Sequence, residues 1–171
     1  MGWAAVTALV LSIAAVPGRV GEFTAKSGDD RVLDRSRIRG KVVLAFYEAD
    51  GEQEINATLK AELKTFNETQ LTKVERLMVV PFADVSRIIW PFKGVAAGKL
   101  DDASKEVGLT IYGDWDGSVR AGFGFTEGTP NLMVIDDKGI IRLRAAGKVQ
   151  SGDFDKIKKL IKKLVDGEPV P

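Results

Sequence analysis

The chain has 171 residues, 44% of them apolar, and is long enough to bury a core as one domain. Its 25 Lys and Arg residues nearly balance 24 Asp and Glu residues, and a net charge of +1 provides no overall attraction to nucleic acid or an anionic membrane. The sequence contains no Cys and no His, which excludes thiol nucleophiles, disulfides, imidazole bases and Cys/His zinc sites. Any chemistry must therefore use carboxylates, amines, hydroxyls or the backbone.

The chain begins with an apolar run of fourteen residues, Trp3 to Val16. This length is typical of a signal-peptide core and is shorter than the roughly 20 residues that a spanning helix needs. No Lys or Arg precedes the run. We predict that residues 1–19 are a signal peptide or hydrophobic N-terminal segment and that residues 20–171 are one domain. A retained anchor and a buried helix of the fold are the alternatives for the first segment.

Two strands and a helix are predicted in the first half of the domain, after a short first strand at residues 20–26. Residues 41–47 are a continuous apolar run, typical of a central strand buried on both faces, and residues 77–82 are a second such run. Between these runs, apolar residues recur at helical spacing, at Ile55, Leu59, Leu63 and Phe66. This pattern predicts an amphipathic helix over roughly residues 52–67, and a strand, helix and strand in succession indicate a parallel βαβ unit.

The second half of the domain is predicted to contain a hairpin between helices. Residues 101–108 are expected to end a second helix, and the Gly-rich stretch 112–124 is expected to be an extended loop. Two apolar runs, 132–135 and 140–143, flank a Gly-containing turn of the kind that closes an antiparallel hairpin. Residues 153–165 carry one apolar stripe and are predicted to form the last helix.

Three segments, residues 38–47, residues 128–139 and the terminal amphipathic helix, carry a resemblance to exported thioredoxins of the TlpA/ResA type. Residues 38–47 are similar to the family pattern L-x-G-K-V-V-L-x-F-W, and residues 128–139 are similar to G-T-P-x-x-x-x-I-D-x-x-G. The resemblance implies an α/β, thioredoxin-like fold: a central mixed sheet flanked by helices, with a C-terminal β-hairpin and helix. The turn at 56–59, the segment 112–124 and the absent cysteines look most like the YtfJ-type exported proteins. This nearer resemblance implies a periplasmic or cell-envelope location more than a mechanism.

The sequence departs from that family where its chemistry takes place. A Cys-x-x-Cys motif begins the helix after the first buried strand in the family, and the matching residues here are Gly51, Glu52, Gln53 and Glu54. Dithiol exchange needs one sulfur to attack as a thiolate and another to resolve the mixed disulfide. A chain without cysteine excludes this activity. Pro130 resembles the family's cis-proline, beside which the backbone binds extended peptides, so Thr129 is the residue expected to contact a peptide.

We therefore hypothesise a redox-inactive, exported protein that binds an unknown protein or peptide. Carboxylates at a helix start are stabilised by the helix dipole, and together with Asp50 they are expected to select a basic or amide-rich partner. The predicted binding residues are Asp50, Gly51, Glu52, Glu54, Thr129 and Pro130. We assign no catalytic residue, cofactor or metal, and expect no nucleic-acid partner. Membrane association is expected only through the N-terminal segment, if it is retained.

Two other classes of function remain open. A carboxylate-based enzyme or metal-binding protein is one; Asp114 and Asp116 resemble a fragment of a calcium loop, but the later ligands of such a loop are missing, which favours a plain turn. A structural subunit of an envelope assembly, held by the apolar N-terminus and exposed aromatic loops, is the other. Packing in the core is nevertheless the favoured interpretation of the loop aromatics Trp90, Phe92, Trp115, Phe123 and Phe125.

Overall fold

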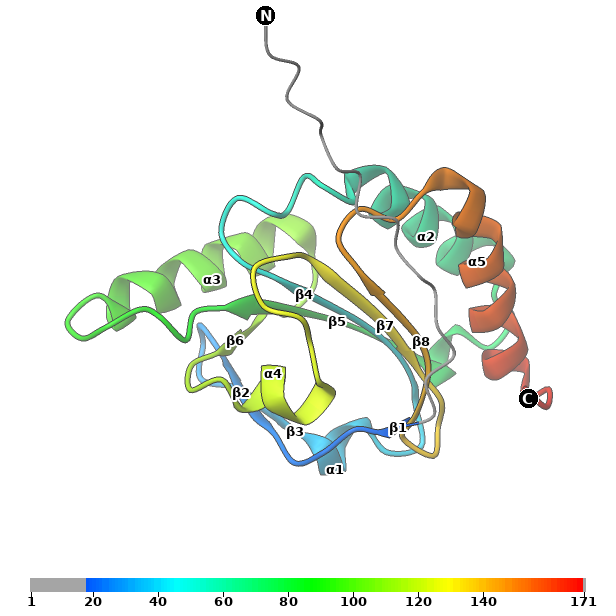
Figure 1. Cartoon of the computed structure of the whole chain (residues 1–171), viewed down its shortest axis with the longest axis horizontal. Helices are drawn as coiled ribbons and strands as arrows, with labels where there is room; N and C mark the ends of the chain where they lie inside the picture. Colours follow the sequence, from blue (N-terminus) through cyan, green and yellow to red (C-terminus); the bar gives the residue numbers. More distant parts are fainter. Residues whose placement is uncertain (1–17, 171) are drawn as a thin grey trace, which may run out of the picture.

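The computed structural model describes residues 18–170, which form a mixed eight-stranded sheet with helices against it (Figure 1). The strands are β1 (Gly18–Arg19), β2 (Thr24–Ser27), β3 (Val32–Asp34), β4 (Val42–Glu48), β5 (Leu77–Asp84), β6 (Tyr112–Asp114), β7 (Asn131–Ile135) and β8 (Ile140–Ala146). The helices are α1 (Arg35–Ile38), α2 (Ala57–Gln70), the 3-10 turn η1 (Val74–Arg76), α3 (Lys93–Val107), α4 (Ser118–Phe123) and α5 (Ser151–Asp166). Within residues 18–170, each helix is too short or too polar to cross a bilayer.

Strand β4 lies inside the sheet, whose strand order is β1-β8-β7-β4-β5-β6-β2-β3. It is parallel to β5 and antiparallel to β7, and its first six residues are buried. Alternate side chains enter two separate cores, because successive residues of a strand point to opposite faces. The central strand and the parallel β4-α2-β5 unit are therefore confirmed.

Different helices cover the two faces of the sheet. Helices α2 and α5 pack together on one face, where the expected stripe of α2, Leu59, Leu63 and Phe66, meets the apolar stripe of α5 (Figure 1). On the other face, α4 and the N-terminal strands enclose a cluster of aromatic rings, in which Phe123 and Phe125 stack with centroids 5.0 Å apart. Both faces are thus covered, as expected for a central sheet flanked by helices.

The segment 112–124, expected to be an extended loop, instead forms β6 and α4, so that prediction is wrong. Strand β6 has three residues, too few to show a pattern, and it exists because β5 and β2 pair on either side of it. Helix α4 begins after Gly117 and ends at Gly124, which both have positive φ. The same glycines that suggest a loop therefore cap a helix that buries Val119 and Phe123.

The N-terminal part differs from expectation as well. Most of the predicted segment 1–19 lies outside the described residues, but Gly18 and Arg19 form β1 and pair with β8. The chain then crosses to the other edge of the sheet, where β2 pairs with β6 and β3. The strand predicted at 20–26 begins only at Thr24, and the buried Val20 and Phe23 pack in the core from the preceding connection.

A close approach between the β2–β3 turn and α3 gives the first testable prediction. A Cβ atom added to Gly28 would lie 2.2 Å from the carbonyl oxygen of Ala97, in the backbone of α3. We expect Gly28→Ala to lower the free energy of unfolding by about 1–3 kcal/mol, because the backbone must move. Gly98→Ala is the control: it lies on α3 with nothing within 4 Å, and we expect a gain of about 0.5–1 kcal/mol. Urea unfolding measures both; equal effects would contradict this packing.

Candidate functional site

One edge of the sheet gathers the predicted binding residues. Strands β4, β5 and β6 are parallel and end there, and β7, antiparallel to β4, begins there. The β4–α2 and α4–β7 connections both lie at this edge (Figure 1). In open α/β sheets, ligands bind outside the carboxyl ends of the strands. We call this place the carboxyl edge.

The β4–α2 connection is an exposed, acidic turn that is braced from within. Glu52 accepts a hydrogen bond from the Ala49 N–H at 2.8 Å, and Gln53 accepts one from the Gly51 N–H at 2.9 Å. Asp50 and Glu54 are exposed, and their carboxylates make no hydrogen bond or ion pair within residues 18–170. The helix itself begins at Ala57, later than the predicted residue 52. The carboxylates therefore belong to the turn before the helix.

Glu48 lies at the base of this turn and is mostly buried. Burial raises the pKa of its carboxyl, and the nearby Glu52 and Glu54 raise it further, while Lys60 opposes the shift. The Lys60 Nζ atom donates to both carboxylate oxygens of Glu48, at 2.9 and 3.0 Å, and to the Gln53 carbonyl at 2.7 Å. Within residues 18–170, Lys60 is thus the one cation that bonds residues 48–54, which carry four carboxylates. The exposed surface of this turn is therefore negatively charged.

The α4–β7 connection lies beside that turn because Tyr47 of β4 pairs with Asn131 of β7. The buried Asn131 side chain donates to the Thr126 and Thr129 carbonyls and accepts from the Thr126 N–H. Thr129 is partly exposed, and neither its N–H nor its hydroxyl makes a hydrogen bond within residues 18–170. The Thr129–Pro130 peptide bond is trans; among the described residues only Trp90–Pro91 is cis. Pro130 therefore does not have the cis geometry of the proline that it resembles.

A chain of hydrogen bonds connects the two sides of the carboxyl edge. The Asn56 side chain, 5% exposed, donates to the Gly147 carbonyl at 3.0 Å and accepts from the Val149 N–H at 2.9 Å. The Gly147 N–H donates in turn to the Pro130 carbonyl at 2.7 Å. The start of α2, the end of β8 and the Thr129–Pro130 segment are therefore held together.

A buried carboxylate, Asp114, supports the same edge from below. It accepts hydrogen bonds from the Tyr47 hydroxyl at 3.1 Å and from the N–H groups of Val119 and Arg120 at 3.2 and 2.9 Å. Burial and the Asp114 charge both raise the pKa of Tyr47, so its hydroxyl stays protonated and donates. This carboxylate fixes the start of α4 against β4.

Asp84, at the end of β5, is also held in its ionised form. Burial alone would raise the pKa of its carboxyl, but hydrogen bonds from the Ser86 hydroxyl and N–H and the charge of Arg120 lower it overall. Arg120 lies 3.5 Å from Asp84 and 3.5 Å from Glu127. Asp84 and Glu127 thus both have partners inside the protein. Their contacts with Arg120 connect the end of β5, helix α4 and the α4–β7 connection.

The acidic side chains of residues 18–170 are spread over several separate bonded turns. In the part of the chain that the structure describes, no three acidic side chains converge closely enough to hold an ion. Asp116 accepts from the Ser118 N–H at 2.9 Å, at the start of α4, and Asp114 is fully buried. The fragment that resembles a calcium loop is thus the bonded turn that begins α4.

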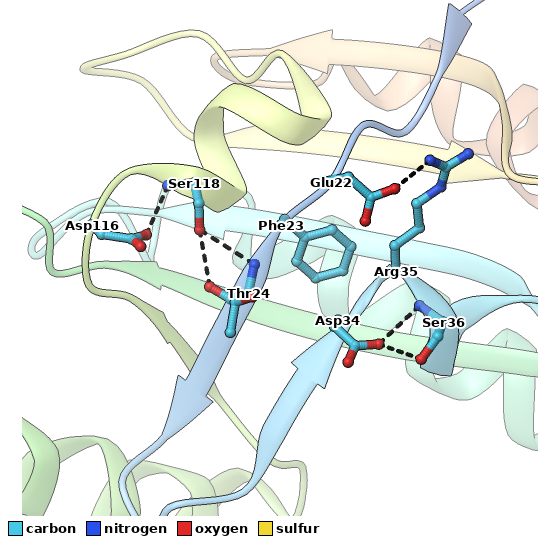
Figure 2. Close-up of a pocket in the computed structure, with 8 residues that line it drawn as sticks. All are labelled: Glu22, Phe23, Thr24, Asp34, Arg35, Ser36, Asp116 and Ser118. Carbon is cyan, nitrogen blue, oxygen red and sulfur yellow. Dashed lines mark hydrogen bonds and ion pairs between the residues drawn. The ribbon is translucent and has the colours of Figure 1, made fainter.

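A hollow of about 460 Å³ lies on a different part of the molecule, where β2, the start of α1 and the start of α4 meet (Figure 2). Its polar side chains already bond one another: Ser118 bonds the backbone of Thr24, Arg35 pairs with Glu22, and Asp34 caps α1 (Figure 2). These contacts fasten α4 and α1 to β2. None of the predicted binding residues lines this hollow.

The structure thus brings together both groups of predicted residues, 50–54 and 129–130, at one edge. Sequence reasoning missed three supports of this edge: Asn56, Asn131 and Gly147. Asn131 directly precedes an apolar strand, and an amide at such a place is a weak signal for a loop clamp. Gly147 gave no signal, because its role depends on a partner 91 residues away in the sequence.

Comparisons with known proteins agree with this architecture. No protein-family model matches the sequence, and no curated protein matches it. A secreted thiol-disulfide isomerase from Corynebacterium glutamicum is similar in structure, with a TM-score of 0.66, 13% identity and coverage of 97% of this chain and 98% of the other. A DsbF homologue from Corynebacterium diphtheriae has a TM-score of 0.62 at 12% identity, covering 94% of this chain and 98% of the other.

A third similar structure is the pneumococcal exposed lipoprotein thioredoxin from Streptococcus pneumoniae. Its TM-score is 0.58 at 17% identity, and the match covers 84% of this chain and 100% of the other. Identities this low establish the fold alone, and the predicted α/β fold of thioredoxin-like type is confirmed. The first of these neighbours is named as a thiol-disulfide isomerase and the third as a thioredoxin, whereas this chain has no cysteine. The resemblance to YtfJ-type proteins stays a prediction.

The clamp formed by Asn56 gives the second testable prediction. Asn56→Ala leaves the Gly147 carbonyl and the buried Val149 N–H without their partner, and we expect the free energy of unfolding to fall by about 2–3 kcal/mol. Asn67→Ala is the matched control on the same helix, because the Asn67 Oδ1 atom is buried without a hydrogen bond. We expect this variant to match or exceed the wild type. Chemical unfolding of both variants measures their free energies of unfolding. If Asn67→Ala lost as much stability as Asn56→Ala, the role assigned to the Asn56 hydrogen bonds would be contradicted.

Proposed function

We propose that this chain of thioredoxin-like fold is a redox-inactive binding module that holds an extended, basic segment of a protein or peptide at its carboxyl edge. The absence of cysteine removes dithiol exchange from these 171 residues. The surface proposed to bind consists of Asp50, Gly51, Glu52, Glu54, Thr129 and Pro130, and we call it the 50/129 surface. Pro130 is buried and its carbonyl accepts from the Gly147 N–H, so it supports Thr129 from below. The 50/129 surface occupies the place of the family's reactive motif and proline.

One observation supports this proposal most directly. Groups with unused hydrogen-bonding capacity from two distant segments lie at the same edge: the Asp50 and Glu54 carboxylates, and the N–H and hydroxyl of Thr129. Extended peptides bind sheet proteins through main-chain hydrogen bonds and gain specificity from side-chain contacts. The Thr129 N–H can supply a main-chain hydrogen bond, and the Asp50 and Glu54 carboxylates can supply side-chain contacts.

The charge of the turn favours a basic partner. Glu48, Asp50, Glu52 and Glu54 lie within seven residues, and Lys60 is the cation that bonds there. Glu48 is already paired with Lys60, and Glu52 already accepts from Ala49. Asp50 and Glu54 therefore remain as the carboxylates that a lysine or arginine of the partner would meet. Such exposed pairs contribute modestly and weaken in salt.

We also propose that the protein works outside the cytoplasm, in the periplasm or cell envelope. The apolar run at residues 3–16 supports this, since its length is that of a signal-peptide core. Similar structures named as a secreted isomerase and as an exposed lipoprotein agree with it. Mass spectrometry of the mature N-terminus from the native host tests whether this segment is removed.

Binding of a short extended peptide gives the third testable prediction. A fluorescent peptide alternating Lys and Thr should bind more tightly than its Glu-containing counterpart. We expect Asp50→Asn combined with Glu54→Gln to weaken binding of the Lys peptide by about fivefold to tenfold, with less effect in high salt. Fluorescence anisotropy measures the dissociation constants.

The control variant combines Glu68→Gln on α2 and Glu106→Gln on α3, which change the net charge equally at exposed positions whose carboxylates form no ion pair within residues 18–170. We expect less than about a twofold effect, because rim charges far from a ligand are screened. Thr129→Arg should also reduce binding by obstructing the surface. Equal losses in both double variants would show a nonspecific charge effect, and a wild-type protein that does not discriminate between the two peptides would contradict the proposal.

A further inference from the structure

The end of the β5–α3 connection and the first turn of α3 together expose an unbroken run of seven residues, 89–95, which we call the Trp90 loop. Of the nine large apolar side chains exposed in the described part of the chain, four lie in this loop. They are Ile89, Trp90, Phe92 and Val95, with 69%, 83%, 61% and 62% of their surface exposed. Core packing, expected for Trp90 and Phe92, is therefore wrong. Contiguous apolar exposure of this kind marks a surface that meets an apolar phase or partner.

The Trp90 loop is a projecting tip with a defined backbone. It follows the connection after β5 and includes the start of α3, at the far left of Figure 1. The Phe92 N–H donates to the Ile89 carbonyl at 2.9 Å, and the Ala96 N–H donates to the Phe92 carbonyl at 3.0 Å. A convex, closed turn with outward apolar side chains has the right shape to enter a deformable layer.

The charged residues of the segment itself are of one sign, although Asp84 and Asp101 flank it and Asp116 is near enough to interact with the charge of Lys93. Residues 85–100 contain Arg87, Lys93 and Lys99 and no Asp or Glu, although the whole chain has nearly equal numbers of acids and bases. Arg87 pairs with Glu127. Lys93 and Lys99 are exposed and form no ion pair within residues 18–170. The loop and the next turn of α3 thus offer two cations, Lys93 and Lys99, near the apolar tip.

We propose that the Trp90 loop inserts into the surface of a bilayer that contains anionic phospholipid. Trp90 and Phe92 lie at the boundary between headgroups and acyl chains, where amphipathic aromatic rings are stable, and Lys93 and Lys99 contact the lipid phosphates. The combination of an exposed Trp-Pro-Phe tip with lysines that form no ion pair among the described residues favours an anionic lipid surface, which accepts aromatic rings and basic side chains together. The contact uses none of the residues of the 50/129 surface and none of residues 1–17.

Fluorescence of the full chain tests this directly. The sequence has three tryptophans, so combining Trp3→Phe and Trp115→Phe leaves Trp90 as the sole reporter. We expect its emission to shift to the blue, and to be quenched by brominated acyl chains, on addition of vesicles with equal parts of phosphatidylcholine and phosphatidylglycerol. Phosphatidylcholine alone should give a much smaller response. Because Trp115 donates to the Lys26 carbonyl, circular dichroism must show that this variant is folded.

Charge reversal separates the loop from a general charge effect. Lys93→Glu with Lys99→Glu should weaken vesicle binding by about tenfold or more. Lys159→Glu with Lys163→Glu changes the same charge on α5, at exposed residues without an ion pair among those described, and should leave binding within about twofold because that helix is not at the tip. In vesicle flotation with the other tryptophans intact, Trp90→Ala with Phe92→Ala should also bind about tenfold less.

Unchanged Trp90 emission would overturn the proposal, including the case in which the protein floats with vesicles through residues 1–17 alone. Equal losses from the two charge reversals would overturn it too. A response of Trp90 to a purified protein partner, without any response to lipid, would identify a protein-docking loop and contradict membrane insertion.

Discussion

The buried side-chain amide of Asn56 is the contact on which the carboxyl edge depends. It bonds the backbone of Gly147 and Val149, and Gly147 in turn bonds the carbonyl of Pro130. Segments that are far apart in the sequence are thus held at one edge by a few directional bonds. A surface that is fixed before its ligand arrives loses less conformational entropy on binding, which is what a noncatalytic binding module requires.

The carboxylates of this edge divide into an inner and an outer set. Asp114 and Asp84 are buried or nearly so, and backbone and side-chain donors satisfy them. Asp50 and Glu54 are exposed and without such partners among the described residues. Acid and base catalysis by two carboxylates needs one that can change its proton near the working pH, in an environment distinct from the other. The inner acids are engaged in holding loops, and the outer ones are suited to attract a cationic ligand.

The parts of the fold that could be predicted from the sequence are those with a local pattern. Strand β4, the hairpin β7–β8 and helix α5 each carry a run or periodicity that has one structural meaning. Strand β6 and helix α4 could not be predicted, because the strand depends on neighbours and the helix is bounded by glycines that usually indicate loops. Such elements are specified by tertiary contacts rather than by local composition.

For the candidate site, the family resemblance located the two groups of residues, 50–54 and 129–130. It could not predict which side chains hold these two segments in place. The roles of Asn56 and Asn131 depend on backbone partners brought close only by the folded chain. Pro130 is trans, although the matching proline in the family is cis. The exposure of Trp90 and Phe92 was also unpredictable, because apolar side chains are buried by default and only the projecting shape of the β5–α3 connection places these two in solvent.

The central claim is that an extended basic segment binds at the 50/129 surface, and amide chemical shifts of isotope-labelled protein test it most directly. Titration with the Lys-containing peptide should move the signals of residues 48–55 and 126–131 together, with one dissociation constant. Signals around the hollow of Figure 2 should stay in place. Shifts centred on that hollow or on α5, or a spectrum unchanged at saturating peptide, would contradict the account.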